Sequence, residues 1–436
     1  MTDQQALSPE QLVQAAKAGD VDAMYQVASI LGAEGHKEQS VTWLKKAAGN
    51  GHGDARFTLA NFYLKGINLE RNVAQAITIL EAGVKSWHMP SVQLYTALVA
   101  QGAGTERSWT KAVDLLLLSA VRGHSPAMVE LAFLLILAQA QTDLATELMR
   151  AAACRKNLHA GLYIASTLSE DSEKDDHDIA AYWVGRALEL GHPNAEKYKT
   201  LAGAVKEPTM DQAPLPAFDP DIVKTSLHKL TVWTPKDAKT IMDRPNVKKI
   251  EAAIPLSICA YIKALSAPRL QAATEYDMDS GEWVAHSQCK GFVASYWQED
   301  HNMVTFAVAD RLAKAAGADH QFAEQFNVLA FEEEGQYLPR IDFVDPDLPG
   351  SSENLTRAGQ CSHTVELILQ TADEGGEPIY GPTADSIDTA DGDILILRNL
   401  LSDQEPDDQA MSAILPVKKG QKWSALRLIR EKKQDF

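Results

Sequence analysis

The sequence predicts an α + β chain in two parts, an N-terminal array of paired helices and a C-terminal antiparallel β-sandwich or barrel with flanking helices. Three observations support this prediction. Small residues recur at a nearly constant spacing through the first half, a proline-rich segment follows them, and short alternating apolar runs fill the second half. The chain has 436 residues, 45% of them hydrophobic, which is enough for two or three cores.

The helical part is predicted over residues 1–203 from an internal repeat. By subtraction, the small residues are 32, 36, 36, 33 and 35 positions apart at Ala23, Ala55, Ser91, Ala127, Ala160 and Ala195. Between them lies a second apolar stretch at helical spacing, ending near a glycine or asparagine that is typical of a helix C-cap. Histidines recur in the same way, at His52, His88, His124, His159 and His192. We interpret them as capping or packing residues, because equivalent positions lie one repeat apart.

A linker is predicted over residues 204–250. Its first part, residues 204–220, contains four prolines and has no hydrophobic period, which argues against regular structure. Residues 221–250 contain short apolar runs that should pack against one half of the chain, and the sequence does not say which.

The third part, residues 251–436, opens with two helical patterns, PLSICAYIKALSAP and VTFAVADRLAKAAGA. Short alternating runs separated by turns follow: FNVLAF, HTVELILQT, DGDILILRNL, MSAILPV and WSALRLIR. Runs of this length at this spacing predict an antiparallel sandwich or barrel.

Composition restricts the partners. The net charge is 41 − 59 = −18, which disfavours binding to nucleic acid phosphates. The longest apolar run, LAFLLILAQA, is too short to cross a bilayer, and the N-terminal residues lack the pattern of a signal peptide. The four cysteines have no metal-binding spacing and are expected to be reduced thiols. We therefore expect a cytoplasmic protein without a membrane or nucleic-acid partner.

Two family resemblances follow from these motifs. The recurrent A-x-x-x-L/V-A start and A-x-x-G-H end, over about residues 18–203, resemble Sel1-like repeats, which are related to tetratricopeptide repeats. This resemblance implies an α-solenoid that binds a protein or peptide. The stretches FEEEGQYLPRID, TVELILQTADEGGEPIY, DGDILILRN and SAILPVKKGQKWSALRLIR, in this order, resemble the prolyl 4-hydroxylase-like branch of the Fe(II)- and 2-oxoglutarate-dependent dioxygenases. That resemblance implies a double-stranded β-helix, or jelly roll.

The second resemblance also implies a site. The family holds Fe(II) with two histidines and one carboxylate. Here Arg340 and Ser412 occupy the two histidine positions, and Asp342 is the only retained ligand. A guanidinium has donors only and cannot coordinate a cation, so we hypothesise that Arg340 takes the place of the metal beside Asp342.

The residues aligned with the 2-oxoglutarate pocket are better preserved than the metal ligands. They are Lys422, Tyr337 and Thr364. Lys422 could retain an anion or dicarboxylate site, or it could simply open the last strand.

From this pattern we predict a protein-interaction protein with a catalytically degenerate dioxygenase domain, no catalytic residues and no cofactor. Two alternatives remain open. The first is an active oxygenase that hydroxylates a protein or peptide through a non-standard metal site, with Fe(II) and 2-oxoglutarate as cofactors. The second is a metal-free sensor of a small dicarboxylate.

Overall fold

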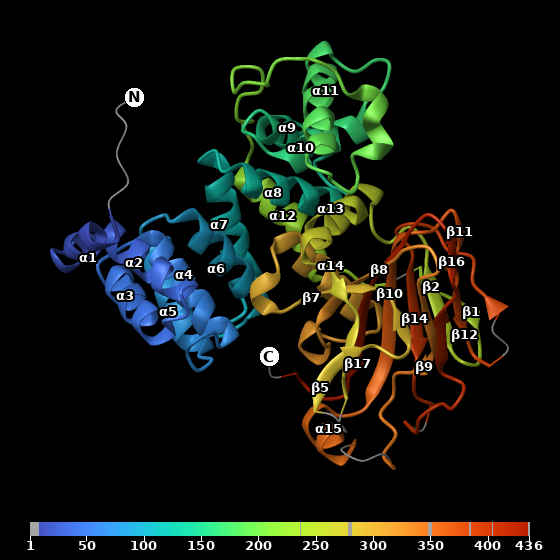
Figure 1. Ribbon diagram of the computed structural model, residues 1–436. Helices are drawn as coiled ribbons and strands as arrows, with labels where there is room; N and C mark the ends of the chain where they lie inside the picture. The colour runs from blue at the N-terminus through green and yellow to red at the C-terminus, as the bar shows by residue number, and fades with distance from the viewer. Residues whose placement is uncertain are drawn as a thin grey trace. The chain divides into compact units, whose positions relative to one another are not determined.

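The computed structural model describes residues 8–235, 237–277, 281–347, 351–382, 385–402 and 404–434. The chain forms two compact units (Figure 1). The first comprises Met1–Ala127 with Gln298–Met303, and the second Met128–Trp297 with Val304–Phe436. The division falls within helix α8 (Ser125–Leu137).

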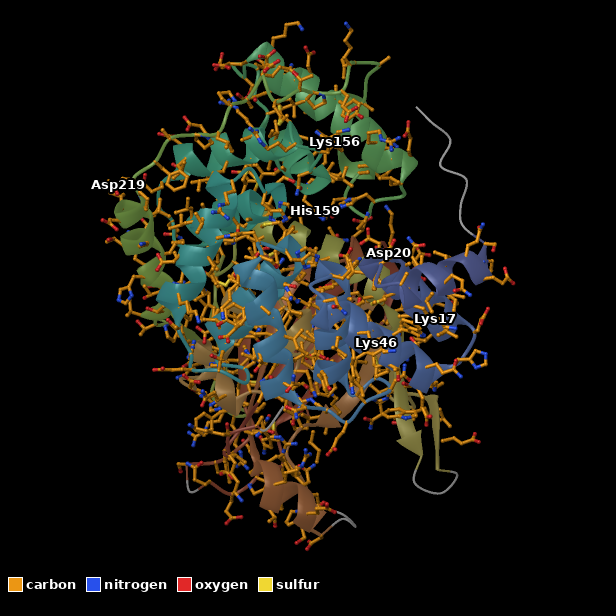
Figure 2. The ribbon with its side chains drawn as sticks, turned by 90° about the vertical axis from the view of Figure 1, so that its left-hand side faces the viewer. Lys17, Asp20, Lys46, Lys156, His159 and Asp219 are labelled. Carbon is orange, nitrogen blue, oxygen red and sulfur yellow. The ribbon has the colours of Figure 1, made fainter. Side chains whose placement is uncertain are left out.

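The first unit consists of antiparallel helices joined by short turns. They are α1 (Pro9–Lys17), α2 (Val21–Ala33), α3 (Lys37–Gly49), α4 (Gly53–Lys65), α5 (Val73–Lys85), α6 (Met89–Gln101) and α7 (Trp109–Val121). Side chains cap most of their starts. The carboxylate of Asp20, which Figure 2 labels, accepts hydrogen bonds from the backbone N–H groups of Asp22 and Ala23, and Nδ1 of His52 accepts one from Ala55.

The recurrent small residues lie where helices pack closely. Ala55 and Ser91 are fully buried. A Cβ atom on Gly83 would lie 2.5 Å from Ser91, so larger side chains would separate α5 from α6. The small residues therefore recur along the sequence because each marks a position where two helices pack closely.

The second unit contains further helices and the β-structure. Its helices include α9 (Thr142–Ala153), α10 (Leu158–Thr167), α11 (Lys174–Glu189), the 3-10 helix η1 (Glu196–Leu201), α12 (Pro220–Thr231), α13 (Leu256–Ser266), α14 (Met303–Ala315) and α15 (Ser351–Ala358). On α10, Gly161 lies against the ring of Trp183 from α11. These last helical pairs belong to the same compact unit as the barrel, whereas the sequence predicted a domain boundary at residue 203.

Within the described residues, the strands form an eight-stranded sheet in the order β1-β2-β14-β10-β17-β8-β7-β3 and a five-stranded sheet in the order β13-β12-β15-β9-β6. Neighbours in both sheets pair antiparallel. Their bounds are β1 (Lys239–Met242), β2 (Val247–Ile250), β3 (Gln271–Ala272), β6 (Cys289–Lys290), β7 (Phe292–Tyr296), β8 (Phe326–Phe331), β9 (Gln336–Ile341), β10 (Cys361–Gln370), β12 (Pro378–Tyr380), β13 (Asp385–Ser386), β14 (Ile394–Arg398), β15 (Met411–Ile414) and β17 (Lys422–Arg430).

Two short ribbons accompany the sheets: β4 (Thr274–Asp277) with β5 (Glu282–Ala285), and β11 (Glu374–Gly375) with β16 (Val417–Lys419). The central strands β10, β14 and β17 are buried along most of their length, and α13 packs against β10. The predicted fold class, helical repeats followed by an antiparallel barrel with flanking helices, is confirmed.

The predicted linker needs a correction. Residues 202–219 form no helix or strand, as expected, but α12, β1 and β2 follow within the range assigned to the linker. Strand β2 pairs with β14, which makes it part of the large sheet. A four-residue strand with two lysines, VKKI, has too short a pattern to be recognised before its partner is known.

Candidate functional site

The five-stranded sheet brings the predicted metal-site residues together. Arg340 lies on β9 and Ser412 on β15, and the two residues are direct partners in the register of these strands. Asp342 follows β9 two positions after Arg340. Positions i and i+2 of an extended chain face the same side, which places both side chains in one cluster.

Arg340 and Asp342 form an ion pair. The guanidinium donates from Nε to Oδ1 of Asp342 at 3.2 Å, and the two side chains are 10% and 9% exposed. The guanidinium also stacks on the ring of Tyr337, 3.8 Å from its centroid. Burial by itself lowers the pKa of Arg340, but the attraction of Asp342 and Tyr337 outweighs burial and raises that pKa overall. Arg340 is therefore a permanent cation at this position.

The second oxygen of Asp342 is held by the large sheet. Thr364 on β10 donates from its hydroxyl to Oδ2 of Asp342 at 2.8 Å, and Asn399 donates to that hydroxyl at 3.1 Å. Both carboxylate oxygens thus have partners within the protein. In the described residues, the buried hydroxyl of Ser412 has no hydrogen-bond partner.

This arrangement does not fit Fe(II) held in the manner of the dioxygenases. One carboxylate, already paired with a guanidinium, faces a serine hydroxyl, and neutral imidazoles are absent from both positions that should carry them. Elsewhere in the described residues, no cluster of three or more His, Cys, Asp or Glu side chains could hold a metal.

Lys422 also has an internal partner. Its side chain is only 1% exposed, and its Nζ lies 3.8 Å from Oε1 of Glu366 on β10. Glu366 accepts further hydrogen bonds from the hydroxyls of Ser424 at 2.6 Å and Tyr380 at 3.5 Å. Burial lowers the pKa of Lys422, and Glu366 opposes that change. A glutamate thus supplies the negative charge that a bound dicarboxylate would bring.

Sequence reasoning missed Glu366, Tyr380 and Asn399. A signal existed for Glu366, which interrupts the apolar run HTVELILQT, because a charged residue on a fully buried strand requires a partner. The identity of that partner depends on the register of β10 against β17, where Glu366 pairs with Leu426 and lies diagonal to Ser424. Sequence alone does not supply this register.

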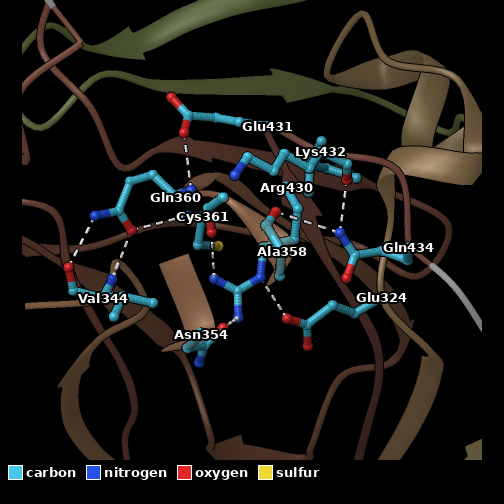
Figure 3. A network of polar contacts seen from close by, with 12 residues as sticks. Glu324, Val344, Asn354, Ala358, Gln360, Cys361, Arg430, Glu431, Lys432 and Gln434 are labelled. Atoms are coloured by element: carbon cyan, nitrogen blue, oxygen red, sulfur yellow. Dashed lines mark hydrogen bonds and ion pairs between the residues drawn. The ribbon is translucent and has the colours of Figure 1, made fainter. Parts of the chain in front are cut away.

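Cys361 on β10 lies close to the Asp342 cluster, because Asn399 donates to its Sγ at 3.4 Å as well as to Thr364, and it also borders a network around Arg430 (Figure 3). Arg430 on β17 donates to Glu324 at 2.5 Å, to Asn354 of α15 at 3.3 Å and to the carbonyl of Gly359 at 3.2 Å. Burial raises the pKa of the Cys361 thiol to about 12, so the thiol stays protonated. The network attaches α15 to the last strand, and Cys361 supplies no reactive thiolate.

Comparison with known proteins gives relatives for part of the chain. No protein-family profile matches the chain. The chain is 23% identical over 205 residues to prolyl 4-hydroxylase subunit alpha-1 of Rattus norvegicus, covering 47% of this chain and 38% of the rat subunit. It is 25% identical over 189 residues to prolyl 4-hydroxylase 1 of Arabidopsis thaliana, covering 40% and 65%.

The chain is therefore similar to prolyl 4-hydroxylases, at 23–25% identity over 40–47% of its length. It spans less than two thirds of either hydroxylase. Among solved structures, the viral collagen prolyl hydroxylase vCPH of Paramecium Bursaria Chlorella virus-1, in its 2OG complex, matches 42% of this chain and 95% of its own, with 16% identity and a TM-score of 0.33. A Sel1 repeat protein from Oxalobacter formigenes matches 44% and 79%, with 19% identity and a TM-score of 0.37.

These comparisons overturn the prediction that no cofactor is expected. The curated relatives are prolyl 4-hydroxylases, enzymes that depend on Fe(II) and 2-oxoglutarate. A 2OG-Fe(II) oxygenase family oxidoreductase from Burkholderia pseudomallei also matches, at 12% identity over 43% of this chain and 86% of its own, with a TM-score of 0.28. Fe(II) and 2-oxoglutarate are therefore the compounds to test.

In the described part of the chain, no helix is both long and apolar enough to cross a membrane.

Proposed function

We propose that this protein is an interaction protein in which the prolyl 4-hydroxylase-like barrel no longer performs hydroxylation, while the Sel1-like repeats bind a protein or peptide partner. The observation that carries the proposal is the buried Arg340–Asp342 ion pair, with the second oxygen of Asp342 occupied by Thr364. A hydroxylase uses that carboxylate to bind its metal, and here each of its oxygens already has a partner within the protein.

The balance of charge in the barrel supports the same proposal. Two cations, Arg340 and Lys422, are matched by two carboxylates, Asp342 and Glu366. A divalent metal would add positive charge beside a guanidinium, and a dicarboxylate would add negative charge beside Glu366. Either addition requires an existing ion pair to open, and breaking a buried pair is costly. The same argument weighs against the dicarboxylate sensor.

The repeats are the proposed binding element. Proteins of this repeat architecture present extended surfaces built from successive helical pairs, which suit protein or peptide ligands.

The test is an anaerobic titration of the purified full-length chain with Fe(II) and 2-oxoglutarate. Bound iron is measured by atomic absorption, and succinate formation is measured after oxygen is admitted. The proposal concerns turnover, so it expects no succinate above a protein-free control at whatever iron content is measured. Stoichiometric iron together with turnover of 2-oxoglutarate would refute it and favour an active oxygenase.

A matched variant makes a negative result informative. Arg340→His combined with Ser412→His restores two imidazoles on neighbouring strands beside Asp342. We expect this variant to bind close to one Fe(II) per chain, because the scaffold brings both positions into register. Succinate formation by the variant together with none by the native chain would support the proposal. Equal succinate formation by the two chains would refute it, because Arg340 and Ser412 would then not be what separates this barrel from a hydroxylase.

A further inference from the structure

A pocket lies in the compact unit formed by residues 128–297 and 304–436. Its volume is about 340 Å³, within the range typical of small-molecule sites. Its walls come from α10, from the turn and 3-10 helix that follow α11, from α13, and from the end of β10. None of Arg340, Asp342, Ser412 or Lys422 contributes to the lining.

One wall is a continuous aromatic surface. Phe133 stacks on Tyr261 at 4.6 Å between ring centroids. His159, on the first turn of α10 (Figure 2), meets Tyr261 edge-on at 5.2 Å and His192 at 5.7 Å. Burial lowers the pKa of His159 to about 4, so its ring is neutral at physiological pH and is part of the apolar wall. A flat apolar group would fit against these rings.

The same pocket also carries excess positive charge. Lys263 on α13 is 8% exposed and donates to the side-chain carbonyl of Gln370. Lys197, which is exposed, repels Lys263, and Asp391 attracts it. The carboxylate of Asp391 already accepts hydrogen bonds from the backbone and hydroxyl of Thr371. The lining therefore contains two lysines and one carboxylate, which already has hydrogen-bond partners.

His192 adds a hydrogen-bond donor to the same pocket. Its Nδ1 accepts from the backbone N–H of Asn194 at 3.2 Å, so in the neutral ring the proton lies on Nε2. That Nε2 is buried and has no hydrogen-bond partner among the described residues. Burial and the nearby Lys263 both lower the pKa of His192, which keeps this tautomer neutral. A buried donor without an acceptor is costly, and a ligand oxygen would remove that cost.

We propose that this pocket binds a small organic acid with a flat apolar body. The carboxylate lies between Lys263 and Nε2 of His192, and the ring lies against Tyr261 and Phe133. The aromatic rings alone would also suit an organic cation, but the two lysines repel one. This site is separate from the proposed function, because Arg340, Asp342, Ser412, Lys422 and Glu366 do not line it, although the carboxylate of Asp391 at its edge also attracts Lys422.

The test compares two probes of nearly equal shape and opposite charge, indole-3-acetate and tryptamine, by isothermal titration against the full-length chain. We expect the acid to bind with one site per chain and a sub-millimolar Kd, and the amine to bind at least tenfold more weakly. Equal binding of the two probes, or no binding of the acid at 5 mM, would overturn the proposal.

Variants then locate the site. Lys263→Met should weaken binding of the acid about tenfold or more, the loss of one charge-assisted hydrogen bond. Lys229→Met, at an exposed lysine on α12, is the matched control and should leave binding unchanged. If Lys263→Met does not fold, Lys197→Met, at the exposed lysine, decides the question, with an expected loss of about threefold. Full affinity in a folded Lys263→Met variant would refute the assignment.

Discussion

Replacing Arg340 with methionine tests the central ion pair. The change removes the guanidinium 3.2 Å from Asp342 and leaves a carboxylate that is 9% exposed with only the Thr364 hydroxyl as a partner. Coulomb's law at 3.2 Å with an effective dielectric constant of about 20 gives an attraction of about 5 kcal/mol, part of which offsets desolvation. We therefore expect Arg340→Met to lower the free energy of local unfolding of β9 and β10 by about 3 kcal/mol.

The assay must resolve the barrel from the rest of the chain, because two compact units need not unfold together. Hydrogen exchange measured by mass spectrometry, on peptides that cover β9 and β10, provides this resolution. The double variant Arg340→Met, Asp342→Asn removes both charges and should recover most of the loss, to within about 1 kcal/mol of the native chain. A single variant that exchanges like the native protein, or a double variant no better than the single one, would refute the reasoning.

Two further predictions concern the helices of the second unit. Burial lowers the pKa of His159 to about 4, below its usual 6.5, so between these pH values the unfolded chain is protonated at His159 and the folded chain is not. The free energy of unfolding should therefore fall by about 2 kcal/mol as pH drops from about 6.5 to 4. His159→Gln should reduce this dependence of stability on pH, as measured by thermal melts. Gly161→Ala would place Cβ 2.2 Å from Cγ of Trp183 and should lower the free energy of unfolding by about 1–3 kcal/mol, as measured by calorimetry. Gly185→Ala on α11, where Cβ meets no atom within 4 Å, is the control and should not lower it. Equal effects of the two substitutions would contradict this packing.

The fold class was predictable because its signals are local and repeated. A period of about 35 residues in small side chains requires helices that pack closely, and alternating apolar runs require a half-buried or buried sheet. The domain boundary predicted after residue 203 was harder to locate from the sequence. The final helical pairs look like the earlier ones in sequence, yet they belong to the compact unit of the barrel, because helices such as α13 and the strands bury apolar surface that no local pattern reports.

The residues at the barrel site divide in the same way. Arg340, Asp342 and Ser412 were identified because ordered motifs around them resemble a known family. Glu366 and Asn399 were missed because their roles depend on which strands neighbour each other. The unpartnered Nε2 of His192 was missed for the same reason, since the sequence suggests only a repeat histidine that caps or packs.

Sequence alone determined that this chain has helical repeats, a jelly-roll-like domain and an arginine and a serine where two metal-binding imidazoles are expected. Only the tertiary structure decided that each oxygen of the remaining aspartate has a partner within the protein, that Lys422 is paired with a glutamate, and that Lys263 and His192 line the same pocket. The physical reason is that side-chain type and spacing are encoded along the chain, whereas charge pairing and burial depend on residues far apart in sequence that only packing brings within a few ångströms of one another.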